Sequence, residues 1–401
     1  MTEDHSVSVL GVGMHPWGKW GRNFVEYGIV AAEAALADAG LAWSDVDFVA
    51  GADTIRNGYP GFIAGATFSQ ALGWQGNRVA SCYAACASGA QALNIARAQI
   101  LSGMSQVALV VGADTTPKGF FAPVGGDRPD DPDWLRFRLL GATNPTYFAL
   151  YARRRMERYG ATTEDFARVR AKNSRHGAAN PNARYPKEFA VDDVLASPVV
   201  ADPLHLLEIC ATSDGGAAVL LTSNEFARRH LGETASPVRV AAISTVTPTY
   251  PQTVIELPAF ATDSAAGVDV SPRPFRDSIA HAAYEEAGIG PEDVNVVEAY
   301  DLSSALELDW YENIGLCKEG EAEKFIWDGN NTYGGEFVTN PSGGLLSKGH
   351  PLGSTGLAQC TELVWHLRGQ AEARQVEGAK IALQHNLGLG GACVMTMYRR
   401  D

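Results

Sequence analysis

The sequence lacks any long apolar run, any run of basic residues and any close pairing of cysteines. No uninterrupted apolar stretch approaches about 18 residues, the length that a membrane-spanning helix needs, and the acidic start Met1–His5 has no apolar signal core. The formal net charge is −14, which argues against nucleic acid or an anionic membrane surface as the main partner but permits a local basic pocket. Six cysteines without short even spacing do not indicate a disulfide framework. We therefore expect a soluble, cytoplasmic protein.

The composition and the apolar pattern predict an α/β fold. The 401 residues are 46% hydrophobic and 19% charged, which is enough for a large core and two structural halves. Strands are predicted at Val7–Gly13, Asp45–Ala50, Val107–Gly112, Ser213–Leu221, Val238–Ile243 and Lys380–Gln384, and helices at Tyr27–Asp38, closed by Gly40, and after Cys86. The alternation of strand and helix is typical of α/β proteins. The glycines after the first strand do not match a dinucleotide loop, because the third glycine is missing.

Cys86 is the candidate nucleophile. It precedes an apolar helical pattern, so we expect it at the first turn of a buried helix, where backbone N–H groups and the helix dipole favour a thiolate. The alternative is a small core residue, since cysteine is among the residue types most often buried.

An internal duplication links Cys86 to a histidine. Ala39–Val49 matches Ala287–Val297 in its Gly, Asp and Val positions, and the segment starting at Cys86 corresponds to the one starting at His350, with a glycine three residues after each. Two such βαβ halves would bring both helix starts together across a pseudo-twofold axis. A thiol beside an imidazole forms an activated nucleophile or an acid/base pair.

The segment between the halves has a different character. Residues 117–203 contain a proline- and glycine-rich stretch and a helix with Arg153–Arg158, whose arginines form a solvated face or meet the phosphates of a substrate. We expect residues 1–116 with 204–265 to form an N-terminal half, 117–203 an inserted loop domain and 266–401 a C-terminal half.

Several long motifs, in the right order, resemble the thiolase superfamily and specifically its sterol-carrier-protein-2-type (lipid-transfer-protein-like) branch. They are Cys86-Ala-Ser-Gly, Asp202-Pro-Leu-His-Leu-Leu with Ser213-Asp-Gly-Gly-Ala-Ala, Asn340-Pro-Ser-Gly-Gly-Leu-Leu-Ser-Lys-Gly-His-Pro-Leu-Gly353 and Gln384-His-Asn-Leu-Gly-Leu-Gly-Gly391. The resemblance implies the five-layered α-β-α-β-α thiolase fold, a homodimer and an acyl-CoA thioester substrate, with coenzyme A held only as part of the substrate and no metal. It also implies that Ser342, Gly343, Asn386 and Gly390 contact the coenzyme A group.

One motif departs from the branch, at Tyr300-Asp-Leu-Ser303. Thiolases of the branch are expected to carry His-Asp-Cys-Phe there, where the histidine helps to bind the thioester oxyanion and the cysteine moves protons. The C-terminal loop has His385 where other thiolases place a cysteine. A tyrosine at position 300 resembles the thiolase-like aldolases of bacterial steroid side-chain degradation, which cleave a β-hydroxyacyl thioester without an acyl-enzyme.

This resemblance predicts a retro-aldol reaction in which Tyr300 and His350 transfer protons. Two alternatives stay open. If Cys86 is a nucleophile, the chain is a degradative thiolase; if Tyr300 only packs at a strand end, the chain is a non-catalytic acyl-CoA or lipid-binding scaffold. The branch also resembles subunits that work with a DUF35 protein, a zinc ribbon joined to an OB-fold, so such a partner is expected.

Overall fold

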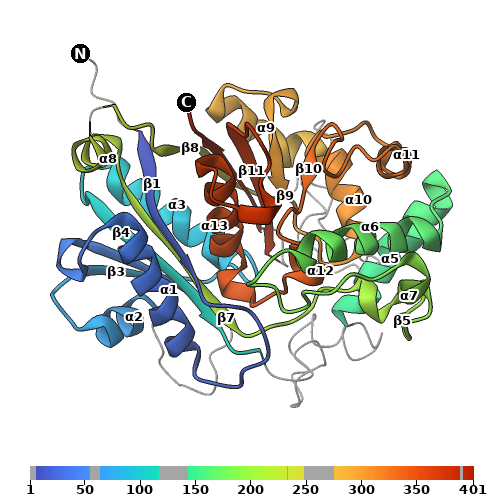
Figure 1. Cartoon of the computed structure of the whole chain (residues 1–401), viewed down its shortest axis with the longest axis horizontal. Helices are drawn as coiled ribbons and strands as arrows, with labels where there is room; N and C mark the ends of the chain where they lie inside the picture. Colours follow the sequence, from blue (N-terminus) through green and yellow to red (C-terminus); the bar gives the residue numbers. More distant parts are fainter. Residues whose placement is uncertain (1–5, 55–63, 117–142, 233, 248–274, 389–391) are drawn as a thin grey trace, which may run out of the picture.

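A large mixed sheet forms the centre of the molecule (Figure 1). The computed structural model describes residues 6–54, 64–116, 143–232, 234–247, 275–388 and 392–401. Within them, ten strands pair in the order β10-β9-β11-β12-β8-β1-β7-β4-β2-β3. Their bounds are β1 Val7–Met14, β2 Phe48–Ala52, β3 Arg78–Cys82, β4 Val107–Asp114, β7 Gly215–Ser223, β8 Val238–Val246, β9 Val296–Glu298, β10 Val338–Thr339, β11 Ile381–Gly388 and β12 Ala392–Arg399, while β5 Val199–Ala201 and β6 Leu204–His205 form a separate pair.

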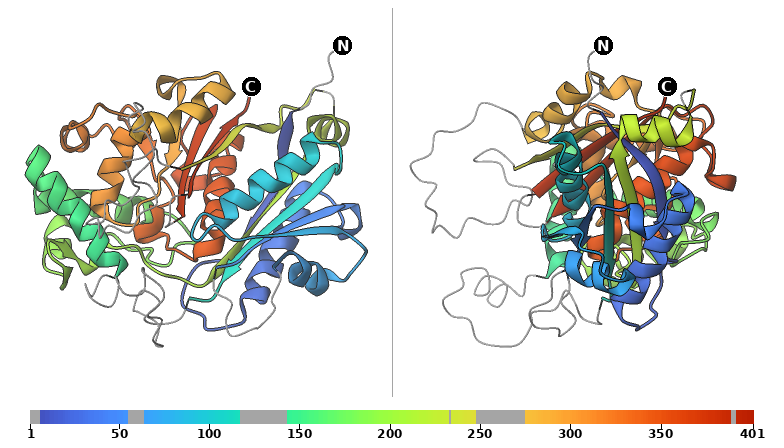
Figure 2. Two further views of the ribbon diagram at one scale, coloured as in Figure 1. Left: turned by 180° about the vertical axis from the view of Figure 1, so that it is seen from behind. Right: turned by 90° about the vertical axis from the view of Figure 1, so that its left-hand side faces the viewer.

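Helices cover the sheet in layers. The described helices are α1 Phe24–Ala39, α2 Ala64–Leu72, α3 Ser88–Leu101, α5 Asn144–Tyr159, α6 Thr163–Ala178, α7 Val191–Leu195, α8 Asn224–Leu231, α9 Phe275–Ala287, α10 Ser304–Asn313, α11 Ala322–Trp327, α12 Gly344–Ser347 and α13 Thr355–Arg368. Three separate apolar cores result: α1 and α2 pack on the N-terminal part of the sheet, α3 and α13 pack together on both parts, and α5, α6, α9 and α10 pack on the C-terminal part. Figure 2 shows α3 lying over the strands of the N-terminal half and running along them. The predicted five-layered α/β fold is confirmed.

The duplicated segments fold alike. Each contains a single 3₁₀ turn, Trp43–Asp45 or Pro291–Asp293, whose last aspartate accepts a hydrogen bond from the backbone N–H three residues earlier. Each turn leads into a strand, β2 or β9, that pairs in parallel with two neighbours. The strand predicted at Asp45–Ala50 therefore begins later, at Phe48, because Asp45 ends the turn. Gly40 closes α1 as predicted, with φ of 64°.

The inserted segment contributes α5, α6, α7 and β5, whose partner β6 lies just beyond the predicted boundary at residue 203. Residues 117–142 of the segment lie outside the described residues. Arg155 corrects one expectation, because it neither faces solvent nor is free to meet a phosphate. Its guanidinium is buried and bonds Asp309, Glu312 and Glu323 at 2.7–2.9 Å. This cluster fixes α5 to the C-terminal half. No helix in the described part of the chain is long and apolar enough to cross a membrane.

Candidate active site

The hydroxyl of Tyr300 lies between the Cys86 loop and His350. It is 3.2 Å from His350 Nε2 and 3.4 Å from the backbone oxygen of Cys86. Tyr300 and His350 are fully buried, and their rings meet edge to face with centroids 5.5 Å apart. Three segments far apart in the sequence therefore meet at one hydroxyl group, as the duplication predicted for Cys86 and His350.

Thr355 sets the tautomer of His350. The Thr355 hydroxyl donates to the Pro351 oxygen at 2.8 Å, so towards His350 Nδ1, 2.7 Å away, it acts as the acceptor. Nδ1 therefore carries the proton, and Nε2 accepts a hydrogen bond from Tyr300. Burial lowers the pKa of His350 to about 3, so the imidazole is neutral at pH 7.

Cys86 is buried just before α3 rather than in its first turn, and this burial opposes the thiolate that the sequence expectation assigned to it. It lies two residues before α3 begins at Ser88. Burial raises the pKa of the Cys86 thiol to about 12, although a hydrogen bond with Tyr300 opposes this shift. Burial also raises the pKa of Tyr300 well above its usual value. The site at rest thus holds a neutral thiol, a neutral phenol and a neutral imidazole.

The segment 209–213 joins the Tyr300 and His350 loops, and the sequence did not single it out. Cys210 N–H donates to the Leu302 oxygen at 2.9 Å, and His350 N–H donates to the Ala211 oxygen at 2.9 Å. Cys210 is a second buried thiol, and burial raises its pKa well above the usual value. Its place beside the Ser213 motif was the signal that could have revealed it.

Asp301 holds the Tyr300 loop in place. Its carboxylate accepts hydrogen bonds from Leu345 N–H at 2.7 Å, Leu346 N–H at 3.1 Å and Asn173 Nδ2 at 2.9 Å. Asp301 therefore ties Tyr300 to α12, which lies just before His350, and to α6 of the inserted segment.

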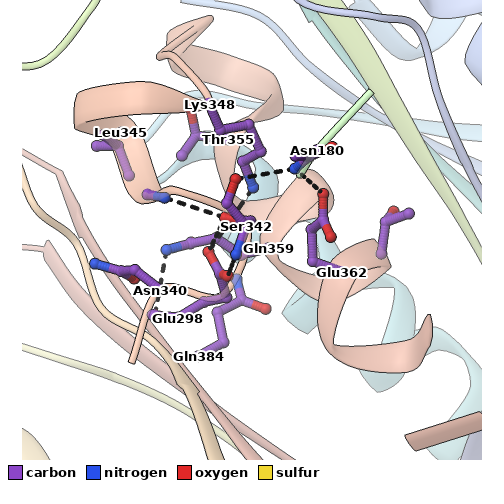
Figure 3. A network of polar contacts seen from close by, with 12 residues as sticks. Asn180, Glu298, Asn340, Ser342, Leu345, Lys348, Thr355, Gln359, Glu362 and Gln384 are labelled. Atoms are coloured by element: carbon purple, nitrogen blue, oxygen red, sulfur yellow. Dashed lines mark hydrogen bonds and ion pairs between the residues drawn. The ribbon is translucent and has the colours of Figure 1, made fainter. Parts of the chain in front are cut away.

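Ser342, one of the residues expected to contact coenzyme A, lies in a buried polar network (Figure 3). Ser342 donates from its hydroxyl to Glu298 at 2.8 Å, and Asn386 Nδ2 donates to Gln359 at 2.8 Å. Gly343 has φ of 97° and touches α6, since a Cβ there would lie 2.5 Å from Gly177 Cα. These contacts support the loops, and the coenzyme A role stays a prediction. Gly390 lies outside the described residues.

His385 is not joined to the Tyr300–His350 pair by any hydrogen bond among the described residues. It is fully buried against Trp310, with ring centroids 4.3 Å apart, and neither ring nitrogen has a partner in the described part of the chain. Burial lowers its pKa to about 3. Its predicted catalytic role stays a prediction without a supporting contact.

Comparison with known proteins identifies the fold family. The thiolase N-terminal domain matches residues 22–225, and the thiolase C-terminal domain-like family matches residues 264–397. The chain belongs to the thiolase family. Its sterol-carrier-protein-2-type branch is shown by sterol carrier protein 2 of Bos taurus, which is 37% identical over 98% of this chain and 72% of its own length.

Two further relatives differ in their chemistry. The benzoylsuccinyl-CoA thiolase subunit BbsB of Thauera aromatica is 33% identical over 100% of this chain and 99% of its own. The solved structure of the Ltp2–ChsH2(DUF35) aldolase superposes with a TM-score of 0.82 and 26% identity, over 99% of this chain and 98% of that one. Thiolase-family chains similar to this one therefore include both a thiolase and an aldolase.

Proposed function

We propose that this thiolase-family protein is an acyl-CoA carbon–carbon lyase that cleaves a β-hydroxyacyl-CoA, with a steroid or lipid side chain, by a retro-aldol reaction. The products are a ketone or aldehyde and a shorter acyl-CoA. The observation that carries the proposal is the Tyr300 hydroxyl bonded to the unprotonated Nε2 of His350. The aldolase among the similar structures supports it.

The pair suits proton removal from the substrate hydroxyl. As the β-hydroxyl gives its proton to the Tyr300 oxygen, Tyr300 passes its own proton to His350 Nε2. Neither Tyr300 nor His350 alone is an effective base, because the tyrosine pKa is raised and the histidine pKa is lowered. A relay avoids a free tyrosinate.

The atoms, electrons and protons of the carbon–carbon cleavage then balance without a cofactor. The Cα–Cβ bond breaks, its electrons form the thioester enolate, and the β-oxygen becomes the carbonyl of the product. The proton held on His350 returns through Tyr300 to Cα, which regenerates both groups. In this reaction Cys86 only shapes the pocket.

A degradative thiolase is the second candidate, favoured by the intact Cys86 and by the thiolase among the relatives. It requires a Cys86 thiolate, whereas burial raises the pKa of that thiol to about 12. The Tyr300 hydroxyl also forms a hydrogen bond with His350 Nε2, the nitrogen that would take the thiol proton.

The deciding experiment supplies a β-hydroxyacyl-CoA to the purified protein without free coenzyme A. Retro-aldol cleavage releases the carbonyl product, and added coenzyme A does not change the rate. A thiolase instead leaves the β-hydroxyacyl-CoA intact and cleaves the matching β-ketoacyl-CoA only when coenzyme A is added. Binding of the thioester without any product would indicate the non-catalytic scaffold instead.

The assembly and location belong to the same proposal. We infer a cytoplasmic location from the six cysteines without disulfide spacing. We infer a homodimer because β3 is an edge strand of the described sheet and exposes Val79, while Tyr83 just beyond it is 74% exposed. The aldolase neighbour contains a DUF35 protein, so we also infer a DUF35 partner here. Light scattering of the purified chain, alone and with that partner, measures both associations. A monomer that stays unchanged in mass on mixing would contradict both.

A further inference from the structure

A cavity of about 460 Å³ lies beside α6, away from the Tyr300–His350 pair. We call it the α6 cavity. It is bounded by α6, by the segment 188–191 and by the segment 326–332. Its walls combine Phe189, Val191 and Ile326 with three cationic side chains of α6 and a single carboxylate, Glu188. A volume of this size fits a small organic ligand.

The three cations that line the cavity differ in how they are neutralised. Arg168 bonds Glu164 at 2.8 Å and lies 3.4 Å from the centre of the Trp327 ring. Lys172, at the buried end, bonds Glu307 at 2.5 Å. Arg175 is exposed and has no carboxylate partner among the described residues. It is therefore the cation at the cavity that a ligand can reach.

A fourth cation of α6 is buried behind the cavity wall. Arg170 is 1% exposed, and its guanidinium lies 4.9 Å from the centre of the Phe189 ring, which lines the cavity. Its Nε and Nη1 have no hydrogen-bond partner in the described part of the chain. Burial lowers the pKa of Arg170 to about 10, against the attraction of Asp301 and Tyr185. The Asp301 carboxylate is already used by Leu345, Leu346 and Asn173.

We propose that the α6 cavity binds a small organic anion, a carboxylate or a phosphate ester, whose charge is met by Arg175 and by Arg170 behind Phe189. Arg170 is unfavourable by itself, because its buried Nε and Nη1 lack hydrogen-bond partners in the described part of the chain, and an anion in the cavity on the other side of Phe189 offsets part of this cost through space. Guanidinium groups also form strong charge-assisted bonds with both kinds of anion. The apolar wall around Phe189 suits the organic part of the ligand.

The site is separate from the active site but is connected to it. Lys172 at the end of the cavity bonds Glu307, Glu307 accepts from Asn173 at 2.5 Å, and Asn173 donates to Asp301, the neighbour of Tyr300. Lys172 also donates to Thr339, next to the loop that leads to His350. Because this connection links the two sites, a change in turnover would not separate them, and the binding test measures the thermal stability of the protein instead.

Thermal unfolding of the full chain at constant ionic strength tests the proposal. The probes are inorganic phosphate and hexanoate, each compared with sodium chloride. We expect Tm to rise with probe concentration, by mass action on the folded state. A response to phosphate alone assigns a phosphate ester, a response to hexanoate alone assigns a carboxylate, and a response to both supports the shared chemistry. No response to either probe would overturn the proposal.

Two variants and a control locate the site. Arg175→Ala should raise the apparent Kd about tenfold, which corresponds to loss of one charge-assisted contact. Arg170→Met should unfold at the same or a higher Tm without anion, because an unpaired buried charge is removed, and should weaken the anion response less than Arg175→Ala does, because Arg170 does not line the cavity. Arg229→Ala removes an arginine on α8 that is 56% exposed, and should respond like the wild type. Equal responses in Arg175→Ala, Arg229→Ala and wild type would show that the anion binds elsewhere, and Arg175→Ala alone decides if Arg170→Met does not fold.

Discussion

A Cβ atom on Gly89 would lie 2.6 Å from the carbonyl oxygen of Gly353. These are the matching glycines of the two duplicated motifs, three residues after Cys86 and three after His350. Gly112 on β4 approaches the same oxygen, at 2.7 Å from an ideal Cβ. The absence of side chains on Gly89 and Gly112 lets the Gly353 backbone come close, and this contact brings the Cys86 and His350 loops together.

Gly89→Ala should therefore destabilise the protein, although alanine is the better helix former by up to about 1 kcal/mol. The new methyl group meets backbone and the Leu357 side chain at 3.2 Å, and overpacking of this kind costs about 1–3 kcal/mol. Denaturant unfolding measures the change. A stability equal to or above that of the wild type would mean that the two loops have room to separate.

Tyr300→Phe should lower the retro-aldol rate by about 10²-fold or more, because the variant removes the hydroxyl that relays the proton. Cys86→Ala should retain most of the activity on the same β-hydroxyacyl-CoA, assayed without coenzyme A. The phenylalanine variant keeps the ring packed against His350, so its stability serves as the control. A large loss in Cys86→Ala but not in Tyr300→Phe, measured on a β-ketoacyl-CoA with added coenzyme A, would indicate that Cys86 forms an acyl-enzyme and that the protein acts as a thiolase.

The duplication allowed much of this site to be predicted from the sequence. Matching glycines and helix starts placed Cys86 near His350, and the motif at Tyr300 placed a third group with them. The charge state of Cys86 could not be predicted in the same way. The helix-dipole argument is local, whereas the burial that raises the thiol pKa arises from tertiary packing in the apolar core that includes Tyr300 and the α5 residue Phe148.

Other parts of the site were also beyond the sequence pattern. Arg155 looked like part of a basic helix face, but its partners Asp309, Glu312 and Glu323 lie more than 150 positions later in the chain. The positions of Thr355 and Cys210 in the sequence show no recognisable spacing pattern relative to His350 or Cys86. Their roles depend on hydrogen bonds and tertiary contacts that only the folded chain defines.

Thr355→Val should lower kcat by about ten- to a hundredfold with little change in KM, since removing a partner that orients a functional histidine has effects of this size. The variant removes the acceptor of His350 Nδ1–H and leaves either nitrogen free to carry the proton. Thr355→Ser keeps the hydroxyl and should retain most of the wild-type rate. A Thr355→Val variant that keeps the wild-type rate would show that the hydrogen bond to Nδ1 does not set the working tautomer of His350.

His385→Leu should make the protein more stable in mild acid. In the folded state burial lowers the pKa of His385 to about 3, whereas the unfolded chain titrates near 6.5. The stability that neutral His385 contributes is therefore complete above about pH 6.5 and is lost as the pH falls towards 3, because the unfolded state binds the extra proton. A leucine at this position binds no proton in either state, and its side chain fits the apolar surroundings of Trp310.

The free energy of unfolding of His385→Leu minus that of the wild type should be about 2 kcal/mol larger at pH 5 than at pH 7. This value follows from one proton taken up on unfolding over about 1.5 pH units. Urea unfolding at both pH values measures it. His281→Gln, at a histidine whose side chain is 47% exposed, should follow the wild-type pH dependence. Parallel curves for His385→Leu and wild type would show that His385 is protonated in the folded protein, and a turnover loss of more than about 10²-fold at pH 7 would support the catalytic role predicted for it.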